Sequence, residues 1–121
     1  MAAYRRKLGA LGEGIACGYL EQKGYLILER NFRCREGEID IIARKDDCIV
    51  FAEVRTRRSP GFGTPEESVT LSKRERLAAL SEAYLQTCDA LPPSWRIDVV
   101  AIELEKNGAV RRIEHIENAV G

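Results

Sequence analysis

The sequence of 121 residues predicts an α/β fold, in which a mixed sheet is flanked by helices in the order α-β-β-β-α-β-β. Three observations predict this fold: two segments have apolar residues at helical spacing, five segments are rich in β-formers, and turn residues separate them. The composition is 45% hydrophobic and 31% charged, which is typical of a globular chain. A chain of this length fits one domain, and we therefore predict a single domain over residues 1–121.

The first predicted helix covers residues 3–23, where Leu8, Leu11 and Ile15 fall on one face. Gly24 follows as the expected C-cap. Several glycines lie inside this helix, and each costs about 0.8–1 kcal/mol relative to alanine. They are Gly9, Gly12, Gly14 and Gly18. We interpret them as positions where the helix packs closely on a sheet, in preference to positions that contact a ligand.

Five strands are predicted from apolar and β-branched runs between turn signals. They cover residues 25–33, 38–44, 48–57, 95–104 and 110–117. Lys45-Asp46-Asp47 has the composition of a turn between the second and third strands. Asn107-Gly108 predicts a hairpin between the last two strands.

The second helical region lies between the third and fourth strands. Thr64 is expected to be the N-cap of a helix start, with Pro65 at the first helical position. Ser72 and Glu75 have capping-box spacing, and they are expected to open a longer helix that runs through Leu85. A mixed sheet with helices packed against it follows from this order of elements.

The cysteines and the apolar segments argue against a zinc-binding, secreted or membrane-spanning protein. The four cysteines lie far apart and the chain has one histidine, so the sequence gives no support for a structural zinc site. Scattered cysteines are typical of a reducing compartment. The sequence shows neither a signal-peptide core nor an apolar run long enough to span a membrane. We therefore expect a cytoplasmic protein.

Charge is unevenly distributed along the chain. The formal net charge is zero, which counts against a protein that coats nucleic acid through charge alone. Residues 54–77 nevertheless hold six Lys and Arg residues against three acids. This segment is compatible with a phosphate-bearing partner or with a solvated face. The candidate nucleic-acid contacts are Arg57, Arg58, Lys73 and Arg74.

The main chemical signal is a pair of acids in the second and third strands. A tight turn that pairs Lys45 with Cys48 puts Asp40 directly opposite Glu53. Side chains in that relation have Cβ atoms about 4.5–5.5 Å apart. Two carboxylates in a largely buried sheet need a cation, and Mg²⁺ or Mn²⁺ fits oxygen ligands best.

Arg55 is a candidate catalytic residue beside this acid pair. It lies on the same face as Glu53, where its charge can stabilise the transition state of phosphodiester hydrolysis beside a metal-activated water. The alternative is a surface-exposed sheet face, with an ion pair between Glu38 and Arg55 and no ligand. Glu13, at the edge of the apolar face of the first helix, is a further candidate, and a solvated flank residue is its alternative.

Several motifs together resemble a nuclease family. They are Gly37-Glu38-Ile39-Asp40-Ile41-Ile42-Ala43, Phe51-Ala52-Glu53-Val54-Arg55-Thr56-Arg57, Leu11-Gly12-Glu13, Gly24-Tyr25, Arg30-Asn31-Phe32-Arg33, Gly63-x-Pro65 and Ser72-Lys73. The two strand motifs resemble the D…(D/E)-x-K core of the PD-(D/E)XK nuclease superfamily. Residues 7–102 as a whole resemble the bacterial YraN-like family of endonuclease-like proteins.

The resemblance implies a restriction-endonuclease-like αβββαβ core with an extra C-terminal strand. It also implies metal-dependent cleavage of DNA, with a layout similar to archaeal Holliday-junction resolvases and branched DNA as the expected partner. By this likeness Glu13, Asp40 and Glu53 are expected to be metal ligands or their helpers. Arg55 is expected to occupy the place of the motif lysine.

Arg55 is also the departure from the motif. Arginine keeps the positive charge of lysine but cannot give up a proton. The sequence therefore leaves three functions open: a metal-dependent endonuclease, a nucleic-acid-binding protein that does not cut, and an interaction domain without nucleic acid. The short chain offers a limited phosphate-binding face, which is compatible with a homodimer.

Overall fold

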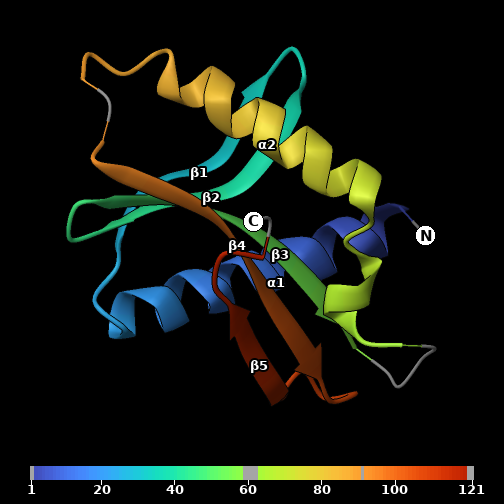
Figure 1. The fold of residues 1–121 in the computed structure, drawn as a ribbon. Coiled ribbons are helices and arrows are strands. Elements are labelled where there is room, and N and C mark those ends of the chain that lie inside the picture. Colours follow the sequence, from blue (N-terminus) through green and yellow to red (C-terminus); the bar gives the residue numbers. More distant parts are fainter. Residues whose placement is uncertain (1, 59–62, 91, 120–121) are drawn as a thin grey trace.

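The structure is a computed structural model, and it describes residues 2–58, 63–90 and 92–119. Helices α1 (Ala2–Gln22) and α2 (Leu71–Leu85) cover opposite faces of a five-stranded sheet, as Figure 1 shows. The strands are β1 (Leu26–Cys34), β2 (Gly37–Lys45), β3 (Cys48–Arg57), β4 (Ser94–Leu104) and β5 (Val110–Ile116). A short 3₁₀ helix, η1 (Pro65–Ser68), precedes α2. This arrangement confirms the predicted αβββαβ core and the extra C-terminal strand.

The order of the strands across the sheet is the same as their order in the chain. Strands β1, β2 and β3 are antiparallel neighbours, β3 and β4 are parallel, and β4 and β5 are antiparallel. Parallel neighbours cannot be joined by a tight hairpin, so the chain from β3 to β4 crosses over through η1 and α2. This crossover brings the beginning of α2 close to the end of β3.

The β2–β3 hairpin has the predicted register near its turn. Lys45 pairs with Cys48 across the two residues Asp46 and Asp47, and Asp46 has a φ of 53°. The pairing continues without a shift as far as Ile41 and Ala52. The alternation of side chains follows from this register and divides the core into two layers.

One core layer lies under each helix. The layer beneath α1 includes Ala16, Cys17, Leu20, Ile41, Val50, Val100 and Ile102. The layer beneath α2 includes Ile42, Phe51, Leu77, Leu80, Ile97 and Val99. Both strand faces are therefore buried near the middle of the sheet, and polar groups there must find partners within the protein.

The helix boundaries confirm two sequence predictions and correct one. Gly24, with a φ of 92°, follows the end of α1, and Thr64 is the N-cap of η1. The longer helix begins earlier than predicted, because Thr70 is its N-cap and the Thr70 hydroxyl accepts a hydrogen bond from Lys73 N at 3.3 Å. Ser72 therefore lies within the first turn of α2. No helix in the described part of the chain is long and apolar enough to cross a membrane.

Only one glycine of α1 needs the close packing that the sequence suggested. A Cβ on Gly12 would lie 1.8 Å from Thr56 Oγ1 and 2.9 Å from Thr56 Cβ, so α1 approaches β3 closely at this point. A Cβ on Gly9, Gly14 or Gly18 would have no described neighbour within 4 Å. Gly12 thus sets the distance between α1 and the end of β3, where the candidate site lies.

Candidate functional site

Asp40 and Glu53 lie where β2 and β3 separate. The last recorded pair of the two strands is Ile41 with Ala52, and the two acids come directly after it. On the other side of β2, the register with β1 also skips Asp40, opposite Asn31, which has a φ of 54°. Asp40 Oδ2 accepts a hydrogen bond from Val54 N at 2.8 Å. The acids thus meet at a fork in the sheet, and the direct cross-strand pairing predicted for them is replaced by this side-chain contact.

The carboxyl group of Glu53 is buried beside that of Asp40. Its side chain is 14% exposed. Burial, the charge of Asp40 and a hydrogen bond with the Asp40 carboxyl group raise the pKa of Glu53 to about 8, although Arg55 and Lys73 act in the opposite direction. Two carboxyl groups this close cannot both ionise easily, so at neutral pH the pair shares a proton.

Arg55 pairs with Glu53 and not with Glu38. Arg55 Nη2 lies 3.0 Å from Glu53 Oε2. Glu38 pairs in register with Arg33 of β1, and Arg33 Nε lies 3.5 Å from Glu38 Oε2. The alternative of an ion pair between Glu38 and Arg55 was therefore wrong, and the recorded pairing of β2 with β3 ends before Glu38, at Ile41 and Ala52. The positive charge of Arg55 is directed to the acid pair.

Glu13 approaches the pair from α1. Burial raises its pKa, and the charges of Asp40 and Glu38 add to this effect, while a hydrogen bond with Asn31 lowers it. Asn31 therefore has two features beside the site: its backbone has a positive φ opposite Asp40, and its side chain forms a hydrogen bond with Glu13. Sequence reasoning proposed Glu13 but missed Asn31, for which asparagine's tolerance of positive φ was the available signal.

The acid pair opens into a pocket of about 230 Å³ that α2 closes on one side. Lys73 and Arg76 of α2 line it together with Asp40, Glu53 and Arg55. Lys73 Nζ also donates a hydrogen bond to Ser68 O at 3.3 Å. Of the two basic residues predicted in the first turn of α2, Lys73 lines the pocket. Arg74 is exposed and does not line it.

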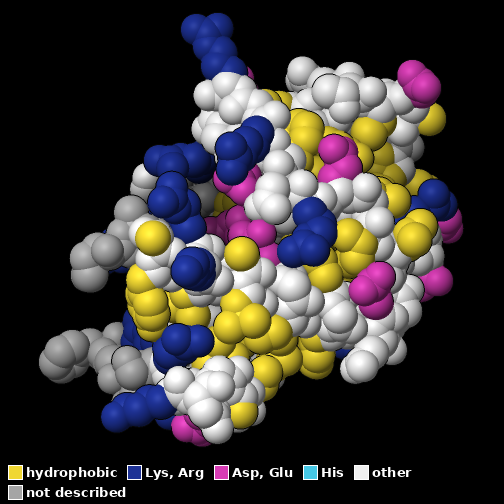
Figure 2. Space-filling view, turned by 180° about the vertical axis from the view of Figure 1, so that it is seen from behind, with side chains coloured by type: hydrophobic (Ala, Val, Ile, Leu, Met, Phe, Trp, Pro, Cys, Tyr) yellow, Lys and Arg dark blue, Asp and Glu magenta, His cyan; other side chains and the backbone are white. Residues whose placement is uncertain are grey.

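Arg57 and Arg58 lie on a second, larger pocket of about 620 Å³. Arg55 lines both pockets and therefore connects them. Figure 2 shows lysine and arginine side chains gathered on one side of the molecule, around acidic side chains that lie deeper between them. Of the four predicted nucleic-acid contacts, Arg57 ends β3, Arg58 follows it, and Lys73 and Arg74 lie in the first turn of α2.

The acid pair has the chemistry of a divalent-cation site. Mg²⁺ is held in proteins by one or two carboxylates, with water and substrate phosphates as its remaining ligands. Asp40 and Glu53 supply two carboxyl groups that compete for one proton, and a divalent cation would relieve that competition. In the described part of the chain, no group of three or more His, Cys, Asp and Glu residues could hold a metal ion. The described residues therefore offer Mg²⁺ or Mn²⁺ two carboxylates, those of Asp40 and Glu53, and do not bring Glu13 into a third ligand position.

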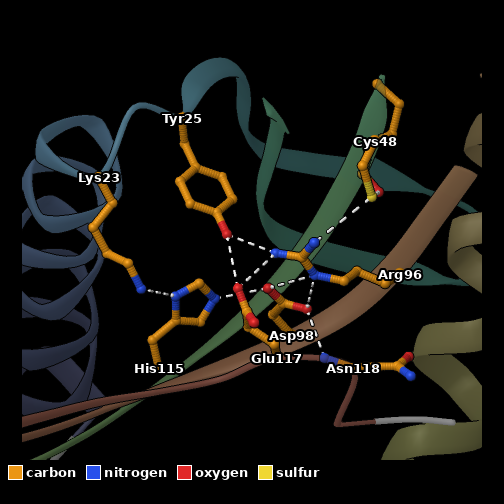
Figure 3. Close-up of polar contacts among 9 residues, drawn as sticks. Lys23, Tyr25, Cys48, Arg96, Asp98, His115, Glu117 and Asn118 are labelled. Atoms are coloured by element: carbon orange, nitrogen blue, oxygen red, sulfur yellow. Dashed lines mark hydrogen bonds and ion pairs between the residues drawn. The ribbon is translucent and has the colours of Figure 1, made fainter. Parts of the chain in front are cut away.

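A second buried acid, Asp98, lies on the α1 side of β4 and belongs to a different polar cluster (Figure 3). Arg96 Nε donates to both oxygens of Asp98, at 3.0 and 3.2 Å. The backbone N of Asn118 donates to Oδ1 at 2.9 Å, and His115 Nε2 lies 2.7 Å from Oδ2. Lys23 Nζ lies 2.8 Å from His115 Nδ1. Because an ammonium group only donates, Nδ1 accepts and Nε2 donates to Asp98.

This cluster satisfies its buried charge. Burial opposes ionisation of Asp98, but the hydrogen bonds from His115, Arg96 and Asn118 outweigh it and hold the pKa of Asp98 below its usual value. Arg96 Nη2 also donates to the Tyr25 hydroxyl group at 2.6 Å. Sequence reasoning missed the cluster, although an aspartate within an apolar strand and the single histidine were signals that could have found it.

Comparison with known proteins identifies the family. The model of the uncharacterised protein family UPF0102 matches residues 12–102, which include the acid pair and both helices' contributions to it. A UPF0102 protein of Roseiflexus castenholzii is 48% identical over 122 residues, covering 99% of this chain and 98% of the relative. One of Syntrophus aciditrophicus is 50% identical over 113 residues, covering 93% and 87%. These matches confirm the resemblance to the YraN-like family. The chain belongs to the uncharacterised protein family UPF0102.

Proposed function

We propose that this protein is a metal-dependent endonuclease that hydrolyses phosphodiester bonds in structured DNA. The observation that carries the proposal is the acid pair Asp40 and Glu53, which lines one pocket with Arg55 and Lys73 and in which the pKa of Glu53 is raised. Such a pair weakens a sheet when it has no ligand, since ionising both carboxyl groups is unfavourable. It is a favourable arrangement for holding a divalent cation.

Each side chain of the pocket has a role in this proposal. Asp40 and Glu53 would hold Mg²⁺ or Mn²⁺, and Glu13, whose pKa the charge of Asp40 helps to raise, adds negative charge near them. When bound, such an ion supplies positive charge to a phosphate oxygen and lowers the pKa of a water molecule. Arg55 and Lys73 add positive charge beside the pair, where the negative charge of a phosphodiester transition state would develop.

Lys73 supplies an ammonium group to the pocket, whereas Arg55 supplies a guanidinium. Arginine at the place of the motif lysine stays protonated, so Arg55 can orient Glu53 and offset charge but cannot transfer a proton. Lys73 lines the same pocket from the first turn of α2, and its positive charge acts on Glu53. We therefore assign to Lys73 the ammonium charge that the motif lysine would supply beside the acid pair.

Cleavage assays test the proposal. Branched, single-stranded and duplex DNA are incubated with the protein and Mn²⁺, and we expect cleavage of branched DNA that Asp40→Ala and Glu53→Gln reduce by about 100-fold or more. Lys73→Ala should cause a large loss, while Arg74→Ala, its exposed neighbour, should retain activity. Cleavage that survives Asp40→Ala would rule out the proposed site, since a contaminating nuclease behaves in that way.

A second function is favoured by Arg55 itself. Its guanidinium is engaged with Glu53 at 3.0 Å, and it stands where the motif has a lysine. A nucleic-acid-binding protein that does not cut DNA would show salt-sensitive binding without turnover. If the wild-type protein is inactive, cleavage gained by Arg55→Lys would favour this function, because it would show a nuclease site that lacks only its lysine.

A further inference from the structure

A groove of about 620 Å³ lies between the first turns of α1, the end of β3 and η1. Arginines line it from two directions: Arg5 from α1, and Arg55, Arg57 and Arg58 from β3 and the residue that follows it. No acidic residue is among the described residues that line it. In a chain of zero net charge, this groove is a local concentration of positive charge. We call it the arginine groove.

The positive charge of the groove is compensated only in part by the described residues. Arg55 pairs with Glu53 at 3.0 Å and the charge of Arg57 acts on Glu67, whereas Glu66 pairs with Arg112 at 2.7 Å, outside the groove. Neither Arg5 nor Arg58 forms an ion pair with a residue that the structure describes. The Nε atoms of Arg55 and Arg58 are buried without a hydrogen-bond partner in the described chain. Buried donors normally have acceptors, and anionic oxygens would satisfy them.

An aromatic ring stands on the wall of the groove. Tyr4 is 48% exposed, and the guanidinium carbon of Arg58 lies 5.9 Å from the centroid of its ring. Tyr4 and Arg58 also line an adjoining hollow of about 180 Å³ together with Lys7. Exposed aromatic rings next to arginines are the surfaces on which proteins stack the unpaired bases of single strands.

We propose that the arginine groove binds a single strand of DNA, with its phosphates along Arg5, Arg55 and Arg58 and one base stacked on Tyr4. A duplex presents its phosphates on a convex surface and hides the faces of its bases, so it offers no base face to Tyr4. An unpaired strand offers both phosphates and base faces to such a recess. Arg55 lines both the groove and the acid pocket, so a bound strand passes beside Asp40 and Glu53.

This last step rests on the proposed function, because it makes an unpaired strand, as found at branches and ends, the substrate that reaches the acid pair. The binding itself does not depend on cleavage. The inference is therefore tested without metal, in EDTA, where a failure of the nuclease proposal leaves the result unaffected.

Fluorescence anisotropy measures the binding of a labelled oligothymidylate and of a duplex of equal length, about 12 nucleotides each. We expect the single strand to bind at least about tenfold more tightly than the duplex at the same salt concentration. Tyr4→Ala should weaken single-strand binding by about 5- to 100-fold, and Tyr4→Trp should preserve it. Tyr4 is exposed, so these substitutions should leave the fold intact, which circular dichroism checks.

Arg5 and Arg6 provide a matched pair for the charges. They are adjacent in α1 and both are exposed, but only Arg5 lines the groove. Arg5→Ala should weaken binding and reduce the slope of log affinity against log salt by about 0.7, as the loss of one phosphate contact requires. Arg6→Ala should change neither quantity appreciably, and Tyr4→Ala should lower the affinity at an unchanged slope.

Two results would overturn the inference: a duplex that binds as tightly as the single strand, or Tyr4→Ala and Arg5→Ala variants that behave like Arg6→Ala. Single-strand binding with the expected variant pattern in a protein that cleaves no DNA would refute the nuclease proposal alone. Cleavage of duplex DNA by a protein whose groove variants bind normally would refute the groove alone.

Discussion

Glu53 and Asp98 belong to neighbouring parallel strands, and Glu53 pairs in register with Val99, the residue after Asp98. Alternation of side chains turns Glu53 towards α2 and Asp98 towards the α1 side of the sheet. Both carboxyl groups are largely buried, and each has an arginine beside it at 3.0 Å. Their pKa values nevertheless move in opposite directions, upward for Glu53 and downward for Asp98.

The opposite pKa shifts of Glu53 and Asp98 come from the groups around each acid other than its arginine. Asp98 receives hydrogen bonds from His115, Arg96 and a backbone N–H group, so its negative charge is stabilised in place. Glu53 has a second carboxyl group, Asp40, as its neighbour, and one arginine does not compensate both. A buried acid with a full set of donors holds a fold together, whereas a buried acid with a surplus of negative charge is a candidate for binding a cation. Burial alone does not distinguish the two.

The largest effect is expected when Asp98, the acid with a full set of hydrogen-bond donors, is removed. Asp98→Ala leaves Arg96, His115 and Asn118 N without their acceptor, and we expect a loss of about 3–5 kcal/mol in the free energy of unfolding. Urea denaturation measures it. Glu117→Ala is the control, because Glu117 also contacts Arg96, at 3.2 Å, but its side chain is 59% exposed. Exposed pairs contribute about 0–1 kcal/mol. Equal losses in the two variants would show that the Asp98 cluster is not structural.

The predictability of the two acids from sequence differs for a physical reason. Asp40 and Glu53 are joined by one hairpin, and a two-residue turn fixes the register of everything near it. The sequence could therefore bring them together. It could not show that the pairing of β2 with β3 ends at Ile41 and Ala52, because β2 also pairs with β1, a third strand, where Glu38 lies opposite Arg33. The alternative ion pair between Glu38 and Arg55 was wrong for the same reason.

The Asp98 cluster shows where local reasoning ends. Its members come from the end of α1, from β4 and from β5, and His115 and Asp98 are separated by 17 positions. The Asn107-Gly108 turn encodes the placement of β5 beside β4, but the register shift between Glu103 and Leu104 and the packing of α1 against both strands are not encoded by that turn. The same limit applies to the arginine groove, which joins Arg5 to Arg55 through the packing of α1 on β3.

A smaller effect concerns the packing of α1 on β3, the strand that carries Glu53. Gly12→Ala places a Cβ against Thr56, a β-branched residue with little freedom to move, and we expect a loss of about 2–3 kcal/mol in unfolding free energy. Gly18→Ala, in open space on the same helix, should stabilise the protein by up to about 1 kcal/mol. Thermal denaturation compares them. A Gly12→Ala variant as stable as Gly18→Ala would mean that α1 is free to move away from β3.

The smallest expected effect is a dependence of stability on pH, which distinguishes Glu53 from Asp98. Glutamate has a pKa of 4.5 in the unfolded reference and about 8 for Glu53 in the folded protein. Between these values the folded protein holds a proton that the unfolded chain has released, so stability falls as pH rises. The contribution is fully present below 4.5 and is lost above about 8. Without metal, Glu53→Gln should remove this loss, because its amide does not ionise.

We therefore expect Glu53→Gln to match the wild type near pH 4 and to exceed it by about 1–2 kcal/mol near pH 9. Denaturation in EDTA across this range measures the difference, with Glu38→Gln as the control on the same strand. A constant difference at every pH would mean that Glu53 is ionised throughout. The pair would then share no proton, and the contrast with Asp98, which Arg96 and His115 keep ionised, would disappear.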